Sequence, residues 1–271
     1  MRLAVLGSPI AHSKSPALHA AAYRVLGLDW TYEAIETDGA GLPGFVESLG
    51  EEWRGLSLTM PLKRDILPLL HTADTLVEIS GSANTVLLEK SGLRGFNTDI
   101  YGITRAFREH QVEQLADAVI LGGGATAGNA IIAAAQLGAG HVSVVVRDPS
   151  RAQELHAIAE RWGLTIDVGT FDSFHFTGAP SALINTLPNG VAVPLTIPLD
   201  VVNQTVLFDV TYDPWPTTLA SAWAADRAIS GLEMLLYQAL IQVRIFVGGE
   251  PDKRLDNENE VLTAMRAAVA N

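Results

Sequence analysis

The feature that most constrains the fold of this chain is an apolar strand that runs into a glycine cluster and then into an alanine-rich helix. Residues 118–121 are apolar, residues 122–124 are glycine, and good helix formers follow over 129–137. In a dinucleotide-binding βαβ unit, Gly122 would permit the tight turn, Gly124 would admit a pyrophosphate, and the small Ala127 would allow close helix packing. A second strand, 141–147, completes the unit, and no Lys-Ser or Lys-Thr pair follows to make a P-loop. Taken alone, the motif is equally consistent with a purely structural glycine turn.

Length, charge and cysteine content narrow the function. A chain of 271 residues, 48% of them hydrophobic, is long enough for one large or two modest globular domains. Its net charge of −12 disfavours a polyanionic partner such as nucleic acid. The absence of cysteine excludes disulfides and thiol catalysis, and no two of the 7 histidines have the i, i+4 spacing of a helical metal site. We therefore expect no metal.

No segment of the sequence is typical of export or membrane insertion. The apolar stretch at 2–6 is too short for a signal sequence, and Gly-Ser-Pro at 7–9 interrupts it. No apolar run approaches the ~18 residues of a transmembrane helix. We expect a cytoplasmic protein without a membrane partner, either a monomer or a homodimer.

The first hundred residues are predicted to form a separate α/β unit. Strands are expected at 3–6, 31–35 and 55–59, and helices at 16–26 and 42–49. Ser15 is expected to be the N-cap of the first helix, with Pro16 at its first position. Strands 85–88 and 93–96 are predicted to form a hairpin, and helix 98–110 leads into the glycine-turn region.

The glycine-turn region is predicted to be a doubly wound parallel sheet. Its six strands are expected near 119–121, 142–147, 165–168, 181–185, 206–209 and 228–229, with helices in most of the gaps. Helices at 231–247 and 257–270 follow, and the last could return to pack on the first domain. The expected fold class is α/β with two α/β domains, residues 1–99 with 236–271 and a Rossmann domain at 100–235.

Polar residues outside the glycine turn gather where predicted elements begin or end. Ser13 and Ser15 lie at a helix start, where unpaired amides favour a carboxylate, although one serine would suffice as a cap. Lys63 follows the strand that ends near Thr59, and a lone lysine is ordinarily a solvated surface charge. Asp99 opens the 98–110 helix, where its ordinary role is capping. Individually, each residue is consistent with a structural role.

Seven blocks in order, however, resemble the signature motifs of the shikimate dehydrogenase family. They are 13–19 (SKSPALH), 58–63 (LTMPLK), 81–85 (GSANT), 95–102 (GFNTDIYG), 122–128 (GGGATAG), 212–219 (YDPWPTTL) and 231–239 (GLEMLLYQA). The chain looks most similar to actinobacterial members, in which a serine such as Ser57 can replace the commoner asparagine. The resemblance implies an NADP-linked oxidoreductase that interconverts 3-dehydroshikimate and shikimate in aromatic amino acid (chorismate) biosynthesis.

The resemblance also implies roles for individual residues. The residues implied for substrate binding are Ser13, Ser15 and Tyr212 at the carboxylate and Thr59, Asn84 and Gln238 at the ring hydroxyls. Lys63 and Asp99 would form the catalytic pair, since oxidising an alcohol requires removal of its hydroxyl proton. The residues implied for cofactor binding are Gly122, Gly123, Gly124, Ala125, Thr126, Arg147, Asp148, Arg151, Val210 and Gly231. Residues 1–99 with 236–271 would bind substrate, residues 100–235 would bind NADP, and the active site would lie between them.

The residues after the second Rossmann strand give conflicting indications about whether the cofactor is NAD or NADP. An acidic residue there ordinarily binds the ribose 2′-hydroxyl of NAD, whereas an arginine accommodates the 2′-phosphate of NADP. Arg147 and Arg151 favour NADP. Asp148 favours NAD unless it caps the helix that follows or pairs with Arg151. We favour NADP, with use of NAD left open.

Three alternatives remain at this point. The first is an NAD-preferring quinate/shikimate dehydrogenase, and the second is a dinucleotide-sensing binding protein without turnover. The sensor would be expected to lack Lys63 or Asp99, and both are present. The third is a structural Rossmann domain, which would not need the polar clusters of the first hundred residues.

Overall fold

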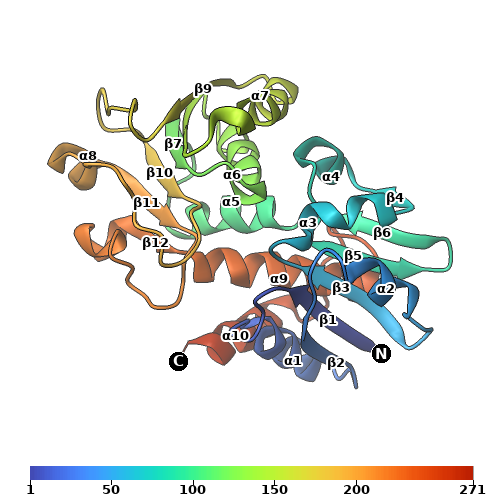
Figure 1. Cartoon of the computed structure of the whole chain (residues 1–271). Helices are drawn as coiled ribbons and strands as arrows, with labels where there is room; N and C mark the ends of the chain where they lie inside the picture. Colours follow the sequence, from blue (N-terminus) through green and yellow to red (C-terminus); the bar gives the residue numbers. More distant parts are fainter. Residues whose placement is uncertain (271) are drawn as a thin grey trace. The chain divides into compact units, whose positions relative to one another are not determined.

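The computed structural model describes residues 1–270, apart from the side chains of residues 151 and 152 (Figure 1). The chain forms two compact units. Unit 1 consists of Met1–Thr98 and the segment that begins at Leu235, and unit 2 is Asp99–Met234. Among the described residues, each unit contains one six-stranded sheet. The predicted α/β fold class is confirmed.

The sheet of unit 1 is mixed. Its strands are β1 (Arg2–Gly7), β2 (Thr31–Glu36), β3 (Trp53–Leu58), β4 (Thr72–Ala73), β5 (Thr85–Glu89) and β6 (Gly92–Phe96), in the order β2-β1-β3-β5-β6-β4. β1 pairs in parallel with β2 and β3, whereas β5 runs antiparallel to β3 and β6. The hairpin predicted for 85–96 is therefore confirmed. The two-residue β4 was not predicted, because so short a strand shows no alternation of apolar residues.

The helices of unit 1 lie over this sheet. They are α1 (Ser15–Val25), α2 (Leu42–Glu47), α3 (Leu62–Asp65), α4 (Thr75–Ser80) and α10 (Glu258–Val269), with η1 (Leu67–Leu69), and most of α9 (Gly231–Gly248). α1 packs along α10 (Figure 1). The predicted N-cap was wrong: Lys14 occupies that position, and Ser15 is already helical. The Ser13 hydroxyl accepts a hydrogen bond from the Ser15 amide at 3.3 Å, which turns the chain into the helix one residue earlier.

Unit 2 has the strand order of a dinucleotide-binding domain. Its strands are β7 (Asp117–Leu121), β8 (His141–Val146), β9 (Thr165–Thr170), β10 (Ala182–Asn185), β11 (Val206–Asp209) and β12 (Ala228–Ser230), and all of their pairings are parallel. The order β12-β11-β10-β7-β8-β9 is doubly wound, so the order reverses between β7 and β10. The connecting helices are α5 (Asp99–Glu109), α6 (Ala125–Gln136), α7 (Ala152–Arg161) and α8 (Leu199–Gln204), with short turns η2 (Pro149–Arg151), η3 (Ala220–Ala222) and η4 (Ala225–Arg227).

Helix α9 corrects the expectation that no apolar run reaches membrane-spanning length. It has 18 residues and, by length and composition alone, is apolar enough to cross a membrane. However, 72% of it is buried inside the protein, as in the core helix of a globular unit. The run was missed because Gln238, Gln242 and Arg244 interrupt it, and in the folded unit these polar side chains are themselves buried.

Candidate functional site

The glycine turn of unit 2 joins β7 to α6. Gly122 has a φ of 115°, and a Cβ at this position would collide with the hydroxyl of Thr186. Gly124 is the N-cap of α6, is exposed, and would meet no atom within 4 Å if it carried a Cβ. Ala127 is fully buried. The partly exposed residues between them are Gly123, Ala125 and Thr126. The first turn of α6 is thus open to an anionic ligand, which fits a dinucleotide pyrophosphate.

Val210 and Gly231 come into direct contact although they are 21 positions apart in the sequence. A Cβ at Gly231 would collide with the backbone carbonyl of Val210, so only glycine fits there. The Gly231 amide also donates a hydrogen bond to the carbonyl of Thr211 at 3.3 Å. This contact fixes the backbone at the carboxyl end of β11, the edge at which doubly wound sheets bind their ligands.

The two residues that follow β8, Arg147 and Asp148, differ in their surroundings. Arg147 is exposed at the end of the strand. The carboxylate of Asp148 accepts hydrogen bonds from the backbone amide and the hydroxyl of Ser150, at 2.9 and 2.8 Å, so it caps the turn that opens η2. Arg151 was predicted to bind the cofactor or pair with Asp148, and its side chain lies outside the described residues.

A buried carboxylate that the sequence did not reveal organises the carboxyl ends of β10 and β11. Asp209 is completely buried and accepts hydrogen bonds from the Asn185 amide group at 3.1 Å, the Thr211 backbone at 3.0 Å and the Thr217 hydroxyl at 2.8 Å. Its position directly at the end of a predicted parallel strand was the available signal. Tyr212, the predicted carboxylate ligand, follows Thr211 and is partly exposed; burial, followed by the charge of Asp213, raises its pKa.

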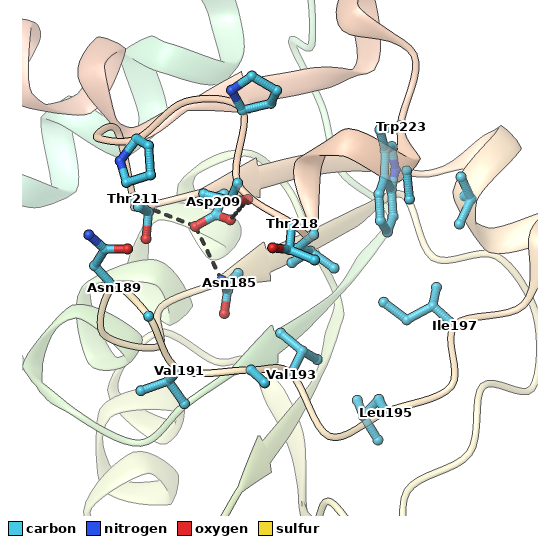
Figure 2. A pocket seen from close by; sticks show the side chains of 18 of the residues that line it. Asn185, Asn189, Val191, Val193, Leu195, Ile197, Asp209, Thr211, Thr218 and Trp223 are labelled. Carbon is cyan, nitrogen blue, oxygen red and sulfur yellow. Dashed lines mark hydrogen bonds between the residues drawn. The ribbon is translucent and has the colours of Figure 1, made fainter.

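Beside this carboxylate lies a cavity of about 680 Å³. Figure 2 shows Asp209, Asn185 and Thr211 grouped together, with a run of apolar side chains along another part of the wall: Val191, Val193, Leu195, Ile197 and Trp223. The cavity is bounded by the loops that follow β10 and β11. The ends of these two strands therefore carry a polar cluster with an apolar hollow next to it.

In unit 1, the predicted carboxylate ligands lie at the N-terminus of α1. Ser13 is partly exposed and Ser15 is buried. Within this turn the Ser13 hydroxyl serves as an acceptor for a backbone amide, as described above. The amides of the first helical turn and the positive end of its dipole favour a carboxylate here.

Lys63 and Thr59 lie at the carboxyl end of β3. Thr59 follows the strand and is held by a hydrogen bond from its amide to the Leu6 carbonyl at 2.9 Å. Lys63 is in α3 and is partly exposed. Its backbone carbonyl accepts a hydrogen bond from the Ala83 amide at 2.8 Å, which ties α3 to the segment that carries Asn84.

Asn84 and Gln238, the other predicted ring-hydroxyl ligands of unit 1, are brought together in a buried cluster with Thr98. The Asn84 amide group donates to the Thr98 hydroxyl at 2.9 Å and to the Gln238 side-chain oxygen at 3.3 Å. All three side chains are nearly inaccessible to solvent. Since 154 positions separate Asn84 and Gln238, the fold, not local sequence, creates this cluster.

Asp99 is the first residue of α5, in unit 2, and is buried. Its carboxylate accepts a hydrogen bond at 3.1 Å from the side chain of Asn129, a fully buried residue of α6. Asn129 was not predicted to have a functional role; the available signal was an amide on an otherwise apolar helix. The hydrogen bond from Asn129 fixes the orientation of the Asp99 carboxylate. A carboxylate that only capped the helix would not need this partner.

Comparison with known proteins identifies relatives over nearly the whole chain. Residues 5–86 match the family described as the shikimate dehydrogenase substrate binding domain. A Thermus thermophilus protein named shikimate dehydrogenase (NADP(+)) is 35% identical over 259 residues, 93% of this chain and 94% of the relative. The chain belongs to the shikimate dehydrogenase family.

Solved structures of the shikimate dehydrogenase family agree with this fold. The Mycobacterium tuberculosis shikimate dehydrogenase is 38% identical, with a TM-score of 0.82 over 98% of this chain and 99% of that one. The Thermus thermophilus enzyme in complex with NADP(H) and shikimate is 31% identical, with a TM-score of 0.82 over 99% of this chain and 100% of that one. The similarity to a mycobacterial protein agrees with the predicted resemblance to actinobacterial members of the family.

Proposed function

We propose that this chain catalyses the reversible, NADP-dependent reduction of 3-dehydroshikimate to shikimate in chorismate biosynthesis. The observation that carries the proposal is its relationship, over 93% of this chain, to the NADP(+) enzyme of Thermus thermophilus, for which a solved complex with NADP(H) and shikimate exists. We further propose that it acts in the cytoplasm, as a monomer or homodimer, without a nucleic-acid or membrane partner.

In this proposal, unit 2 binds the cofactor. Glycines that tolerate no side chain at 122 and 231, and an open helix start at Gly124, fit the close approach of a dinucleotide backbone. The proposed contacts are Gly122, Gly123, Gly124, Ala125, Thr126, Arg147, Asp148, Arg151, Val210 and Gly231. When bound, NADP supplies the hydride donor or acceptor.

The substrate is assigned to the polar groups of unit 1. Ser13 and Ser15 would bind its carboxylate, with Tyr212 of unit 2 assisting. Thr59, Asn84 and Gln238 would bind its ring hydroxyls. A neutral amide can both donate to and accept from a hydroxyl, so buried amides suit a ligand of this kind.

Lys63 and Asp99 are the proposed catalytic pair. In the reduction, the lysine ammonium would deliver a proton to the oxygen that becomes the new hydroxyl, and in the oxidation the amine would take that proton back. Asp99, oriented by Asn129, would keep the lysine charged and directed at that oxygen. The presence of both residues argues against a non-catalytic sensor, and the NADP(+) name of the relative argues against an NAD-preferring quinate enzyme.

The catalytic assignment is tested by steady-state kinetics of shikimate oxidation by NADP. Lys63→Ala and Asp99→Asn should each lower kcat by about 100-fold, the range of general acid–base catalysis, with little change in the KM for NADP. Because the two residues serve one proton transfer, the double variant should lose much less than the product of the single losses. Lys90→Ala, at an exposed hairpin lysine, is the matched control. A normal kcat in either single variant would return that residue to a surface or capping role.

A further inference from the structure

A continuous chain of buried hydrogen bonds in unit 1 connects the α1 helix to the proposed ring-hydroxyl ligands. It begins at His19, which is completely buried and stacked on Tyr32 with ring centroids 3.9 Å apart. His19 contacts Gln242 of α9 at 3.2 Å, and Gln242 contacts Thr85 at 3.0 Å. Thr85 in turn contacts the side chain of Asn84 at 2.8 Å.

Two backbone groups fix the direction of every hydrogen bond in this chain. The Thr98 amide can only donate, and it donates to the Asn84 side chain at 2.9 Å, so that atom is the oxygen Oδ1. The Asn84 carbonyl can only accept, and it accepts from the Gln242 side chain at 3.3 Å, so that atom is the nitrogen Nε2. The orientations of both amides are therefore set by the main chain.

The remaining directions follow from these two. Gln242 Nε2 donates to the Thr85 hydroxyl, whose own proton therefore points to Asn84 Oδ1. On its other side, Gln242 Oε1 accepts from the Ser57 hydroxyl at 3.0 Å and from His19 Nε2. His19 consequently carries its proton on Nε2 and accepts from the Tyr23 hydroxyl at Nδ1, 3.1 Å away.

The direction of these hydrogen bonds determines how the side chain of Asn84, a proposed substrate ligand, is oriented. With Oδ1 of Asn84 held by the Thr98 amide and the Thr85 hydroxyl, the other terminal atom is the NH₂ group, which donates to Gln238 Oε1 at 3.3 Å. The Thr98 hydroxyl lies beside both ends of the amide, 2.9 Å from the nitrogen and 3.1 Å from the oxygen. The NH₂ group, and not the oxygen, is thus presented on the side of Gln238. We infer that Gln242 is a positioning residue for substrate recognition: by orienting the Thr85 hydroxyl it adds a second donor, beside the Thr98 amide, to Oδ1 of Asn84 and so holds the Asn84 amide in place for the ring hydroxyl. This inference rests on the proposed function.

The groups that face Gln242 carry no charge near neutral pH. The donors and acceptors of this hydrogen-bond chain therefore stay the same over that pH range. Burial lowers the pKa of His19 to about 3, even though the Gln242 hydrogen bond raises it. Burial also raises the pKa of Tyr32, the nearest titratable group on β2, and that of Tyr23 on α1. The Arg244 side chain, next on α9, is engaged by Glu258 of α10 at 2.6 Å.

The test reverses the direction of the hydrogen bonds between Gln242, Thr85 and Asn84 instead of removing them. In Gln242→Glu the atom next to Thr85 becomes a carboxylate oxygen, which can only accept when ionised. The Thr85 proton then turns to it and away from Asn84. The KM for shikimate at high pH should rise about tenfold, the size of one lost hydrogen bond, with less than about twofold change in the KM for NADP. Val243→Ala, a buried change on the same helix outside the chain, is the matched control for lost packing.

The variant should also acquire a pH dependence that the wild type lacks. A protonated carboxyl group has one O–H donor, which can replace the amide's donation to Thr85 although not its second donation to the Asn84 carbonyl, so low pH restores the original direction at Thr85. Burial raises carboxyl pKa values, so we expect the KM for shikimate to climb as the pH rises from roughly 6 to 9. In a Thr85→Val background this pH dependence should disappear, because the link to Asn84 is gone.

Each outcome is decisive. Should Gln242→Glu fail to fold, Thr85→Val alone should still raise the KM for shikimate about threefold and spare the KM for NADP. A pH-independent KM equal to that of the control, or an equal rise in both KM values, would overturn the positioning role and leave the proposed function standing. A wild type that does not oxidise shikimate with NADP would overturn the proposed function and the inference together.

Discussion

At the scale of the residue, cofactor choice depends on which side chain after β8 faces the ribose. The carboxylate of Asp148 is engaged at 2.8 and 2.9 Å by Ser150, as a cap would be, whereas Arg147 is exposed. This arrangement makes Arg147 the candidate for the 2′-phosphate and leaves Asp148 to hold the turn.

Arg147→Ala should therefore lower kcat/KM for NADP by about tenfold or more and leave the value for NAD unchanged, since a hydrogen bond to a charged group contributes about 1.5–3 kcal/mol. The measurement is kcat/KM with each nucleotide at saturating shikimate. Arg108→Ala, at an exposed arginine of α5, is the control. A wild type that prefers NAD, with NADP activity intact in Arg147→Ala, would make Asp148 the ribose ligand.

The sequence revealed those site residues that lie in recognisable blocks, and missed those defined only by long-range contacts. Lys63, Asn84 and Gln238 were predicted because a family resemblance marks them. The contact of Ser57 with Gln242 joins residues 185 positions apart, and no local pattern specifies it. Asn129 was missed for the same reason: its partner, Asp99, belongs to another helix.

At the scale of the element, α9 and α10 are joined by a buried ion pair. Two of the three guanidinium nitrogens of Arg244, Nε and Nη2, each lie 2.6 Å from an oxygen of the Glu258 carboxylate. Burial would raise the pKa of Glu258, but hydrogen bonds from Arg244 and Arg254 outweigh it and lower that pKa below 4.5. The pair therefore stabilises unit 1 above the unfolded-state pKa, and this contribution is lost as the pH falls through the folded-state value.

Glu258→Gln should cost about 3 kcal/mol of unfolding free energy at pH 7, because the substitution leaves the Arg244 charge buried without its counter-ion. The cost should shrink on acidification, where the wild-type carboxylate is also neutral. Urea unfolding at pH 7 and at the lowest pH that keeps the wild type folded measures both values. Arg254→Ala removes the exposed partner of the same carboxylate and should cost less than about 1 kcal/mol. Equal costs in the two variants, or a cost independent of pH, would contradict the assignment.

Elements were predicted well where burial imposes a continuous apolar run. Strands β7, β8 and β11 are of this kind, and each was placed within about two residues, the usual uncertainty of an element boundary. α4 was missed although both of its ends are marked, by Asp74, which caps the amide of Val77, and by Gly81 at a φ of 61°. Its six residues are too few to show a helical period, so only the capping signals were available.

At the scale of the whole molecule, unit 1 is assembled from both ends of the sequence. α10 packs along α1, and Phe246 of α9 lies so close to Gly55 of β3 that a Cβ there would collide with its ring. The segment 99–234, in contrast, is contiguous and has its own sheet. The C-terminal helices therefore stabilise the part of the fold that is formed by the N-terminal residues.

Truncation after Gly248, which removes α10, should accordingly loosen residues 1–98 and spare residues 99–234. Hydrogen exchange with peptide resolution should show faster exchange in β1, β2 and α1, and near-native protection in β7, β8 and α6. Affinity for NADP should fall less than affinity for shikimate. Uniform loss of protection along the chain would show instead that the molecule unfolds as a single cooperative whole.

The hydrogen bond between Ser57 and Gln242 also constrains how sequences of this family can diverge. Both side chains are buried, and replacing Gln242 alone would leave the Ser57 hydroxyl proton without its acceptor, a cost of about 1–3 kcal/mol, whereas replacing Ser57 alone would leave Gln242 Oε1 with His19 as its remaining donor. A lineage that keeps Ser57 is therefore expected to keep Gln242. Across aligned relatives, the identity at position 57 should predict the identity at position 242 better than it predicts that of either neighbour on the helix.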